Sequence, residues 1–262
     1  MGALADDRET LLETALIAAR GAGDLLLHQF SRPQHVEQKA DGSIVTGADM
    51  ASERHIKELI TARHPQHTFV GEETGRSERG SRFTWVIDPL DGTKNFLRGV
   101  PLFSVEIALL KDGLPYVGVS NLPMMGDLIW AVRGQGAHSD SGNVRVSRTK
   151  TLNAAYVSFG NLKHFERACR LAGLLSLLKA ASQGRGIGDS WSFHLLARGS
   201  VDIFADARTA FWDIAALAVI IEEAGGVLTD LDGGPISPYS NSVLASNAEL
   251  HTVALSHLRS SM

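Results

Sequence analysis

The stretch Trp85-Val-Ile-Asp-Pro-Leu-Asp-Gly-Thr-Lys-Asn-Phe96 joins an apolar run to a tight turn that carries two acidic residues. The apolar run predicts a β-strand that ends at Asp88, because the proline after it has no N–H to continue the ladder. The glycine in the turn tolerates the backbone angles that a tight turn needs, so Asp91 and Thr93 are brought back toward Asp88. Two carboxylates and one hydroxyl are therefore expected to converge.

Converging oxygen atoms of this kind are the ligands that Mg²⁺ prefers, together with water and substrate phosphate. The backbone carbonyl of Leu90, inside the turn, could complete such a ligand set. The same residues also make a well-formed turn without any metal, since Asp, Pro and Gly are common turn residues. The stretch alone leaves both interpretations open.

Three further acidic positions favour the metal interpretation. Glu72 ends a β-rich run, Asp213 opens the most apolar predicted helix, and Asp49 ends the stretch Ser43-Ile-Val-Thr-Gly-Ala-Asp49. Each has a simpler explanation when it is taken alone, because surface acids are common and an aspartate stabilises a helix N-terminus. Taken together, these carboxylates supply what a two-metal hydrolase requires: bridging ligands, an activated water and a clamp on the leaving oxygen.

Three segments, in this order along the chain, resemble the signatures of the inositol monophosphatase superfamily. They are Gly71-Glu-Glu73, the stretch 85–96, and Trp212-Asp-Ile-Ala-Ala216 followed by Glu223-Ala-Gly-Gly226. The resemblance spans nearly the whole chain, from Lys39 to Asp232. It implies a mixed α/β (α+β) fold built as a layered α/β/α/β/α sandwich, dependence on two or three Mg²⁺ ions per site, frequent inhibition by lithium and often a homodimer.

The resemblance also implies a set of metal ligands. Glu72 and Asp88 would hold the first ion together with the carbonyl of Leu90. Asp88, Asp91 and Asp213 would hold the second ion. These assignments give Asp88 the bridging position between the two ions.

Catalytic and phosphate-binding roles follow from the same resemblance. Thr93, with Glu72 and Asp49, would orient and activate the water that attacks phosphorus, a task for which a metal and a nearby oxygen suffice. The backbone N–H groups of Gly92 and Thr93, at a helix start after the turn, would cradle the phosphate. No phosphoenzyme is expected.

Within the superfamily, the chain is similar to the histidinol-phosphate phosphatase branch. The similarity rests on Lys94 and Arg98 after the turn and on the pair Gly188-Asp189. It implies that Asp189 recognises the cationic amino or imidazole end of histidinol phosphate, and that Lys94 and Asp206 also contact the substrate. A buried acid that faces a cation discriminates sharply, because a neutral ligand leaves the charge unsatisfied. Inositol offers only hydroxyl groups.

The chain departs from this branch at several positions. Asp206 stands where the family commonly has a glutamate that contacts substrate, and Ser190-Trp191 and Arg208 are also unexpected. The basic residues after the turn could equally form a solvated loop, and Asp189 could equally cap a helix. Inositol 1-phosphate, sugar phosphates and nucleoside phosphates therefore stay open as substrates, and a metal-binding interaction protein is the non-enzymatic alternative.

The composition is that of an ordinary globular protein, with 44% hydrophobic and 21% charged residues. A net charge of -4 gives no electrostatic reason to expect nucleic acid or an anionic membrane as a partner, so we expect a small phosphorylated metabolite. Cys169 is the single cysteine, which excludes a disulfide framework and favours the reducing cytoplasm. No apolar run reaches the roughly 18 residues of a membrane-spanning helix, and residues 1–8 lack the pattern of a secretory signal.

Hydrophobic periodicity places helices and strands along the chain. Helices are expected at Thr10–Phe30, Ala51–Arg63, Leu162–Ala172, Asp189–Ala197, Phe211–Ala224 and Ala248–Leu258. Strands are expected at Thr68–Gly71, Trp85–Ile87, Val105–Leu109, Tyr116–Ser120, Leu128–Val132, Ala155–Phe159, Val201–Ala205, Val227–Thr229 and Ser242–Ala245. The turn Lys111-Asp112-Gly113 predicts an antiparallel meander in the first half. We expect two lobes: residues 1–150 with the main metal-binding motifs, and residues 151–262 with Asp213 and the substrate contacts.

Overall fold

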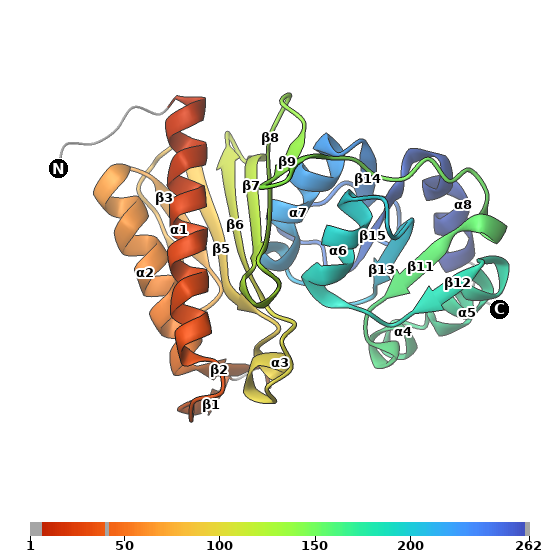
Figure 1. Ribbon diagram of the computed structural model, residues 1–262, viewed down its shortest axis with the longest axis horizontal. Coiled ribbons are helices and arrows are strands. Elements are labelled where there is room, and N and C mark those ends of the chain that lie inside the picture. The colour runs from red at the N-terminus through yellow and green to blue at the C-terminus, as the bar shows by residue number, and fades with distance from the viewer. Residues whose placement is uncertain (1–6, 40–41, 260–262) are drawn as a thin grey trace.

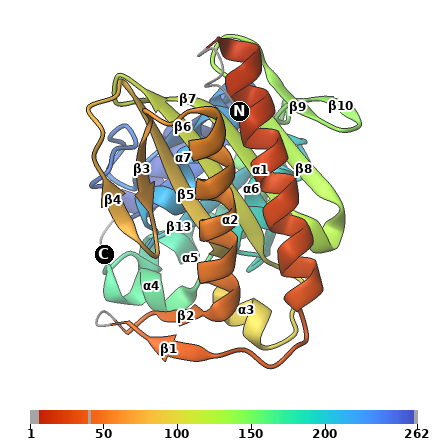
Figure 2. The same ribbon diagram turned by 90° about the vertical axis from the view of Figure 1, so that its left-hand side faces the viewer.

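The computed structural model describes residues 7–39 and 42–259, and Figure 1 shows layers of helix and sheet that follow one another across the molecule. Two helices, α1 (Arg8–Gln29) and α2 (Gly47–Arg63), lie side by side over one face of a large sheet, as Figure 2 shows. A central layer, α6 (Asp189–Ala197) and α7 (Phe211–Glu223), separates this sheet from a smaller one. The last layer consists of α4 (Leu162–Arg167), α5 (Leu171–Ala180) and α8 (Ala248–Arg259). The predicted layered α/β/α/β/α sandwich is confirmed.

The large sheet has eight strands in the order β10-β9-β8-β7-β6-β5-β3-β4. Its strands are β3 (Thr68–Gly71), β4 (Gly75–Ser77), β5 (Phe83–Asp91), β6 (Ser104–Lys111), β7 (Leu114–Leu122), β8 (Asp127–Val132), β9 (Ala137–Ser139) and β10 (Gly142–Val144). From β5 to β10 all neighbours are antiparallel, whereas β3 and β5 are parallel. The predicted antiparallel meander is confirmed, and the parallel pair brings the ends of β3 and β5 to one edge.

The small sheet has five strands in the order β12-β11-β13-β15-β14. They are β11 (Tyr156–Phe159), β12 (Gln183–Arg185), β13 (Ile203–Asp206), β14 (Gly226–Thr229) and β15 (Val243–Asn247). The chain passes from the large sheet to the small one between β10 and β11, the region in which we propose the boundary between two lobes. Several short elements have no counterpart in the sequence prediction: β1 (Val36–Gln38), β2 (Ile44–Thr46), β4, β9, β10, β12 and two 3₁₀ turns. The helix start predicted after the turn at Gly92 is confirmed as α3 (Thr93–Leu97).

The helix predicted at Leu162–Ala172 is wrong, because the chain forms two helices there. α4 ends at Arg167, Cys169 takes a left-handed conformation with φ of 56°, and α5 runs on to Ala180. A left-handed residue cannot continue a right-handed helix. The hydrophobic periodicity does not reveal this break, because apolar residues lie on both sides of it. Phe165 and Leu174, for example, are buried in the same core.

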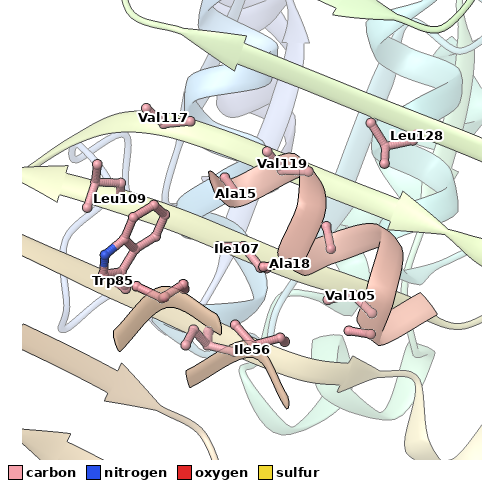
Figure 3. Close-up of a cluster of buried hydrophobic side chains, with 14 of the residues drawn as sticks. Ala15, Ala18, Ile56, Trp85, Val105, Ile107, Leu109, Val117, Val119 and Leu128 are labelled. Atoms are coloured by element: carbon pink, nitrogen blue, oxygen red, sulfur yellow. The ribbon is translucent and has the colours of Figure 1, made fainter. Parts of the chain in front are cut away.

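Buried side chains between the large sheet and the helices α1 and α2 hold these two layers together. Ala15 and Ala18 of α1 are fully buried, and their small side chains let the helix approach the sheet closely. Trp85, Ile107 and other large side chains from β5 to β8 fill the remaining space, as Figure 3 shows. The Trp85 indole also has a hydrogen-bond partner, because its N–H donates to a ring nitrogen of His67 over 3.0 Å.

The central helix α7 is apolar on nearly every side and packs against strands of both sheets. It lies close to the large sheet at Gly118 of β7, where any Cβ atom would overlap the carbonyl of Ala216. Glycine is therefore required at this position, and the close contact fixes the start of α7 beside the ends of β3 and β5. In the described ranges, no helix combines the length and apolar character that crossing a membrane requires.

Candidate active site

The strand predicted to end at Asp88 continues as β5 to Asp91, because a β-bulge accommodates Pro89 and aims the acidic residues into the site. Asp88 pairs with Glu106 of β6 and Asp91 pairs with Ser104, so β5 has one more residue than its partner between the two pairs. After the bulge, Gly92 takes a left-handed conformation with φ of 85° and precedes the short helix α3. A Cβ atom at Gly92 would lie 2.9 Å from the carbonyl oxygen of Leu102, which also restricts this position to glycine.

Acidic residues from three elements meet at this edge. Glu72 follows β3, the parallel neighbour of β5, and its N–H donates to the carbonyl of Ile87 over 3.1 Å. Asp213 lies in the first turn of α7, where its carboxylate accepts from the N–H of Ala210 over 2.7 Å. Glu72, Asp91 and Asp213 line one open pocket of about 520 Å³. Asp88 is 2% exposed and lies close enough to repel all three.

The mutual repulsion of the buried carboxylates in this cluster favours the binding of a cation. Burial raises the pKa of Asp88 well above its usual value, and repulsion by Glu72, Asp91 and Asp213 raises it further. Burial, followed by repulsion from Asp91, raises the pKa of Asp213 to about 7. The ammonium of Lys39 lies 3.0 Å from a Glu72 oxygen and 2.7 Å from a Glu73 oxygen. One lysine thus provides the positive charge beside Glu72, and the aspartates are left facing one another.

The donor chemistry of the cluster fits Mg²⁺, but a ligand set is not preformed. All the candidate ligands present oxygen, the donor that a hard divalent cation requires. In the described part of the chain, however, no three His, Cys, Asp or Glu side chains surround a common point. The carboxylates are instead turned to protein donors: Asp88 to the N–H of Leu90, and Asp91 to the hydroxyl of Ser190 at 2.7 Å.

Thr93 and Asp49 form a second feature of the site. The Thr93 hydroxyl lies 3.1 Å from a carboxylate oxygen of Asp49 and 3.1 Å from the carbonyl of Leu90. The other Asp49 oxygen accepts from the N–H of Thr46 in the capping box of α2. Asp49 therefore caps a helix, the simpler explanation for this residue, and also contacts Thr93. Burial raises the pKa of Asp49.

Part of the pocket wall comes from the small sheet and its connections. Asp206, at the end of β13, has a carboxylate oxygen 3.0 Å from the Nδ1 atom of His164. A carboxylate oxygen of Asp189 accepts from the Asn95 side chain over 3.0 Å, and burial raises the pKa of Asp189 to about 7, with repulsion by Asp91 adding to the shift. Lys94 is exposed and lines the same pocket, as does Gly92. The predicted substrate residues thus line the same pocket as three of the predicted metal ligands, Glu72, Asp91 and Asp213.

A sequence model of the inositol monophosphatase family matches residues 7–262. The chain belongs to this family. A histidinol-phosphatase of Streptomyces coelicolor is 40% identical over 232 residues, covering 85% of this chain and 86% of the relative. A histidinol-phosphatase of Mycobacterium tuberculosis is 37% identical over 253 residues, covering 94% and 97%. Among solved structures, the extragenic suppressor protein suhB of Bartonella henselae superposes with a TM-score of 0.90 at 28% identity, covering 96% of this chain and 99% of that one.

Membership of the inositol monophosphatase family makes this chain a phosphatase that acts on phosphoric monoesters. The superfamily resemblance and the enzyme class predicted from the sequence are therefore confirmed. The individual site residues are placed by geometry alone, and their roles stay predictions.

One local expectation at the site is wrong. Asp189 does not cap α6, because the cap position is occupied by Gly188 and Asp189 is the first helical residue. Asp189 has φ of 48°, a left-handed conformation that is uncommon for a residue with a side chain. Among the residues that the structure describes, no side chain caps the start of α6, and the Ser192 hydroxyl donates to the carbonyl of Gly188 over 2.8 Å. The Asp189 carboxylate is left to face the pocket.

Sequence reasoning missed several residues that contact the candidate site residues in this family member. They are Lys39, Asn95, His164 and Ser190. Each meets its acidic partner across a long stretch of chain; Ser190 and Asp91, for example, are 99 residues apart. No spacing pattern could have revealed these pairs. Of the basic residues noted in the sequence, Arg208 borders the site beside Thr209 and Asp213.

Proposed function

We propose that this phosphatase hydrolyses histidinol phosphate with the help of bound Mg²⁺. The observation that carries the substrate is the pair Asp189 and Asp206, which line the same pocket as Glu72, Asp91 and Asp213. Both are largely enclosed, and burial raises the pKa of each. A cationic group in the pocket would restore their ionised forms, and histidinol phosphate carries such a group at the end opposite its phosphate. The relatives named histidinol-phosphatase support the same choice.

The acidic cluster would hold the metal. In this proposal Glu72, Asp88 and the Leu90 carbonyl bind one ion, and Asp88, Asp91 and Asp213 bind the other. A bound divalent cation lowers the pKa of water and neutralises charge on the phosphate oxygens. Asp88 is the most enclosed of the carboxylates and is repelled by the other three, which suits a ligand shared between two cations.

The remaining residues would orient the reactants. The Thr93 hydroxyl donates its proton to Asp49, so its oxygen is free to accept a hydrogen bond from the attacking water, with Glu72 on the other side. The N–H groups of Gly92 and Thr93 would donate to phosphate oxygens, and the exposed ammonium of Lys94 adds positive charge. Water attacks phosphorus, the ester P–O bond breaks, and the alcohol leaves with a proton. No covalent intermediate forms with the protein.

Related properties of the family extend the proposal. We propose inhibition by Li⁺, a homodimer and a small phosphorylated metabolite as the ligand. Inositol 1-phosphate is the leading competing substrate, because the family bears its name. Hydrolysis of other sugar or nucleoside phosphates, or action as a partner-binding protein, are the further alternatives.

A comparison of kcat/KM for histidinol phosphate and inositol 1-phosphate, with Mg²⁺ present, tests the substrate. We expect histidinol phosphate to be preferred by at least about tenfold, since a hydrogen bond to a charged group contributes ~1.5–3 kcal/mol. Asp189→Asn should remove most of that preference, because the amide keeps the shape of the side chain and loses its charge. Preference for inositol 1-phosphate by tenfold or more would defeat the assignment.

The exposed Asp140→Asn variant is the matched control for this experiment. Asp140 pairs with Arg20 on the surface, so the substitution should change neither rate. A fall in both rates for Asp189→Asn, with the ratio unchanged, would assign that residue to the fold of the pocket and not to substrate choice.

A further inference from the structure

Helix α6 carries a stripe of polar residues that faces the large sheet. Ser190, His194 and Arg198 follow one another at intervals of four residues, so they lie on one side of the helix and its last turn. Ser190 donates to Asp91, His194 contacts Ser120 and Asp127, and Arg198 donates to Asp127 over 2.5 Å. The stripe therefore makes a series of hydrogen bonds from the second half of the chain to the first.

The partners of the stripe lie on different strands of the sheet. Asp91 ends β5, Ser120 lies in β7 and Asp127 begins β8. Most of these contacts are sealed from solvent: His194 and Ser120 are 0% exposed and Ser190 is 2% exposed. A hydrogen-bonding group left without a partner in such a place costs more than the bond itself contributes, so the contacts fix the helix on the sheet.

The middle of the stripe is a complete hydrogen-bond chain. The Ser120 oxygen lies 2.7 Å from an oxygen of Glu106 and 2.7 Å from the Nε2 atom of His194, and the Nδ1 atom of His194 lies 3.0 Å from Asp127. Burial raises the pKa of Glu106 and lowers the pKa of His194. The Ser120 hydroxyl donates to Glu106, and its oxygen also contacts His194, which in turn contacts Asp127.

We propose that His194 is a positioning residue for the metal site: through α6, its bond to Ser120 holds the Ser190 hydroxyl against Asp91 and thereby sets the affinity for divalent cations. The inference rests on the proposed role of Asp91 as a metal ligand. Residues that orient a ligating carboxylate affect metal affinity strongly, although they never touch the ion. Ser190 and His194 belong to one rigid turn of helix, so a displacement at one is transmitted to the other.

Two amide substitutions separate the two bonds of the histidine. In His194→Gln the amide reaches the position of Nε2 and keeps the contact with Ser120. In His194→Asn the shorter amide reaches the position of Nδ1 and keeps only the contact with Asp127. We expect Mg²⁺ binding to weaken by about tenfold in His194→Asn and Ser190→Ala, and by less than about threefold in His194→Gln.

Binding is measured by isothermal titration calorimetry with MgCl₂ on the full chain, so the readout does not depend on turnover. Circular dichroism and the thermal midpoint verify that each variant is folded. Ser139→Ala is the matched control, since this buried serine in β9 bonds only to Ser141 and the carbonyl of Gly142. It should bind Mg²⁺ like the parent protein.

The outcomes distinguish the inference from the proposed function. Equal affinity in His194→Asn and the parent, or equal losses in the Asn and Gln variants, would overturn the positioning role. A double variant of Ser190→Ala with His194→Asn should bind no more weakly than either single variant, because both interrupt one connection; additive losses would also overturn it. Undiminished Mg²⁺ binding in Asp91→Asn would instead reject the proposed ligand assignment.

Discussion

The Asp91 side chain is subject to opposing influences from its neighbours. Burial raises its pKa, the hydroxyl of Ser190 lowers it, and the charge of Glu72 raises it again. The serine comes from α6 and the glutamate from the end of β3, so the pKa of Asp91 depends on the positions of two parts of the chain that are far apart in sequence. We therefore expect the site to be affected more by a substitution that removes the charge of Asp91 than by one that changes its volume.

Replacement of Asp91 by asparagine tests this sensitivity. Asp91→Asn keeps the shape of the side chain and an acceptor for Ser190, but removes a charge that the proposed cations need. We expect hydrolysis to become undetectable in a steady-state phosphate-release assay. The thermal midpoint of the metal-free protein should not fall, because the substitution also relieves repulsion within the acidic cluster. Hydrolysis at the parental rate would show that Asp91 binds no essential metal.

At the scale of elements, the position of α7 determines where Asp213 lies. The helix touches β7 backbone to backbone at Gly118 and Ala216, so the distance between helix and sheet is set by the absence of one side chain. The start of the helix, with Asp213 in its first turn, is thereby held beside the bulge of β5. A change at Gly118 should therefore affect both stability and metal binding, although Gly118 is remote from the site in sequence.

Gly118→Ala tests this coupling. The added methyl group meets the backbone of Ala216, which cannot turn away like a side chain, and overpacking of this kind costs ~1–3 kcal/mol, or about 3 to 10 °C in the thermal midpoint. Differential scanning calorimetry measures the loss, and Mg²⁺ titration should show weaker binding. Gly47→Ala is the control, since it has room for a methyl group at the start of α2 and should not destabilise the protein.

Elements of strong periodicity could be predicted from the sequence. The helix expected at Thr10–Phe30 is α1, and the strand expected at Trp85–Ile87 lies within β5. Short apolar strands such as β3 and β14 were also predicted, whereas short polar or glycine-containing strands such as β1, β4 and β10 were not, because they carry too little apolar pattern to separate a strand from a loop. The apolar sequence around Cys169 likewise gave no sign that a left-handed residue divides one predicted helix into two.

The candidate site could be predicted as a set of acids, but not as a set of contacts. Turn chemistry around Gly92 and the ends of apolar runs indicated which carboxylates would gather. Contacts such as Ser190 with Asp91, or His164 with Asp206, join residues from separate layers and depend on how those layers pack. Such pairs follow from tertiary structure and have no signature in local sequence.

At the scale of the whole molecule, the layers bring together more buried acids than neighbouring cations can neutralise. Burial raises the pKa of Asp213, of Asp189 and of Glu73 to about 7 each. Between about pH 4 and pH 7 the unfolded chain has released these protons and the folded protein retains them. The folded state then binds more protons, so its stability falls as pH rises.

This decrease of folding stability with rising pH can be measured. In EDTA, the thermal midpoint should decrease from pH 5 to pH 8, and saturating Mg²⁺ should reduce the decrease because a cation stabilises the ionised carboxylates. His194 and His251 oppose the trend, since burial lowers the pKa of both, that of His251 to about 4, and their contribution to stability grows as pH rises toward 6.5. The three acids outnumber the two histidines. A midpoint that rises with pH in EDTA would contradict the electrostatic account of the site.

The helix α7 is buried between two sheets that come from different halves of the chain. A fragment that ends near residue 150 would present the bare inner face of the large sheet to water, and the complementary fragment would expose the helix. Neither half is then a self-sufficient folding unit, and heating should give one cooperative calorimetric transition instead of two. Separately produced halves should become soluble only when they are mixed and recover the intact enzyme by complementation.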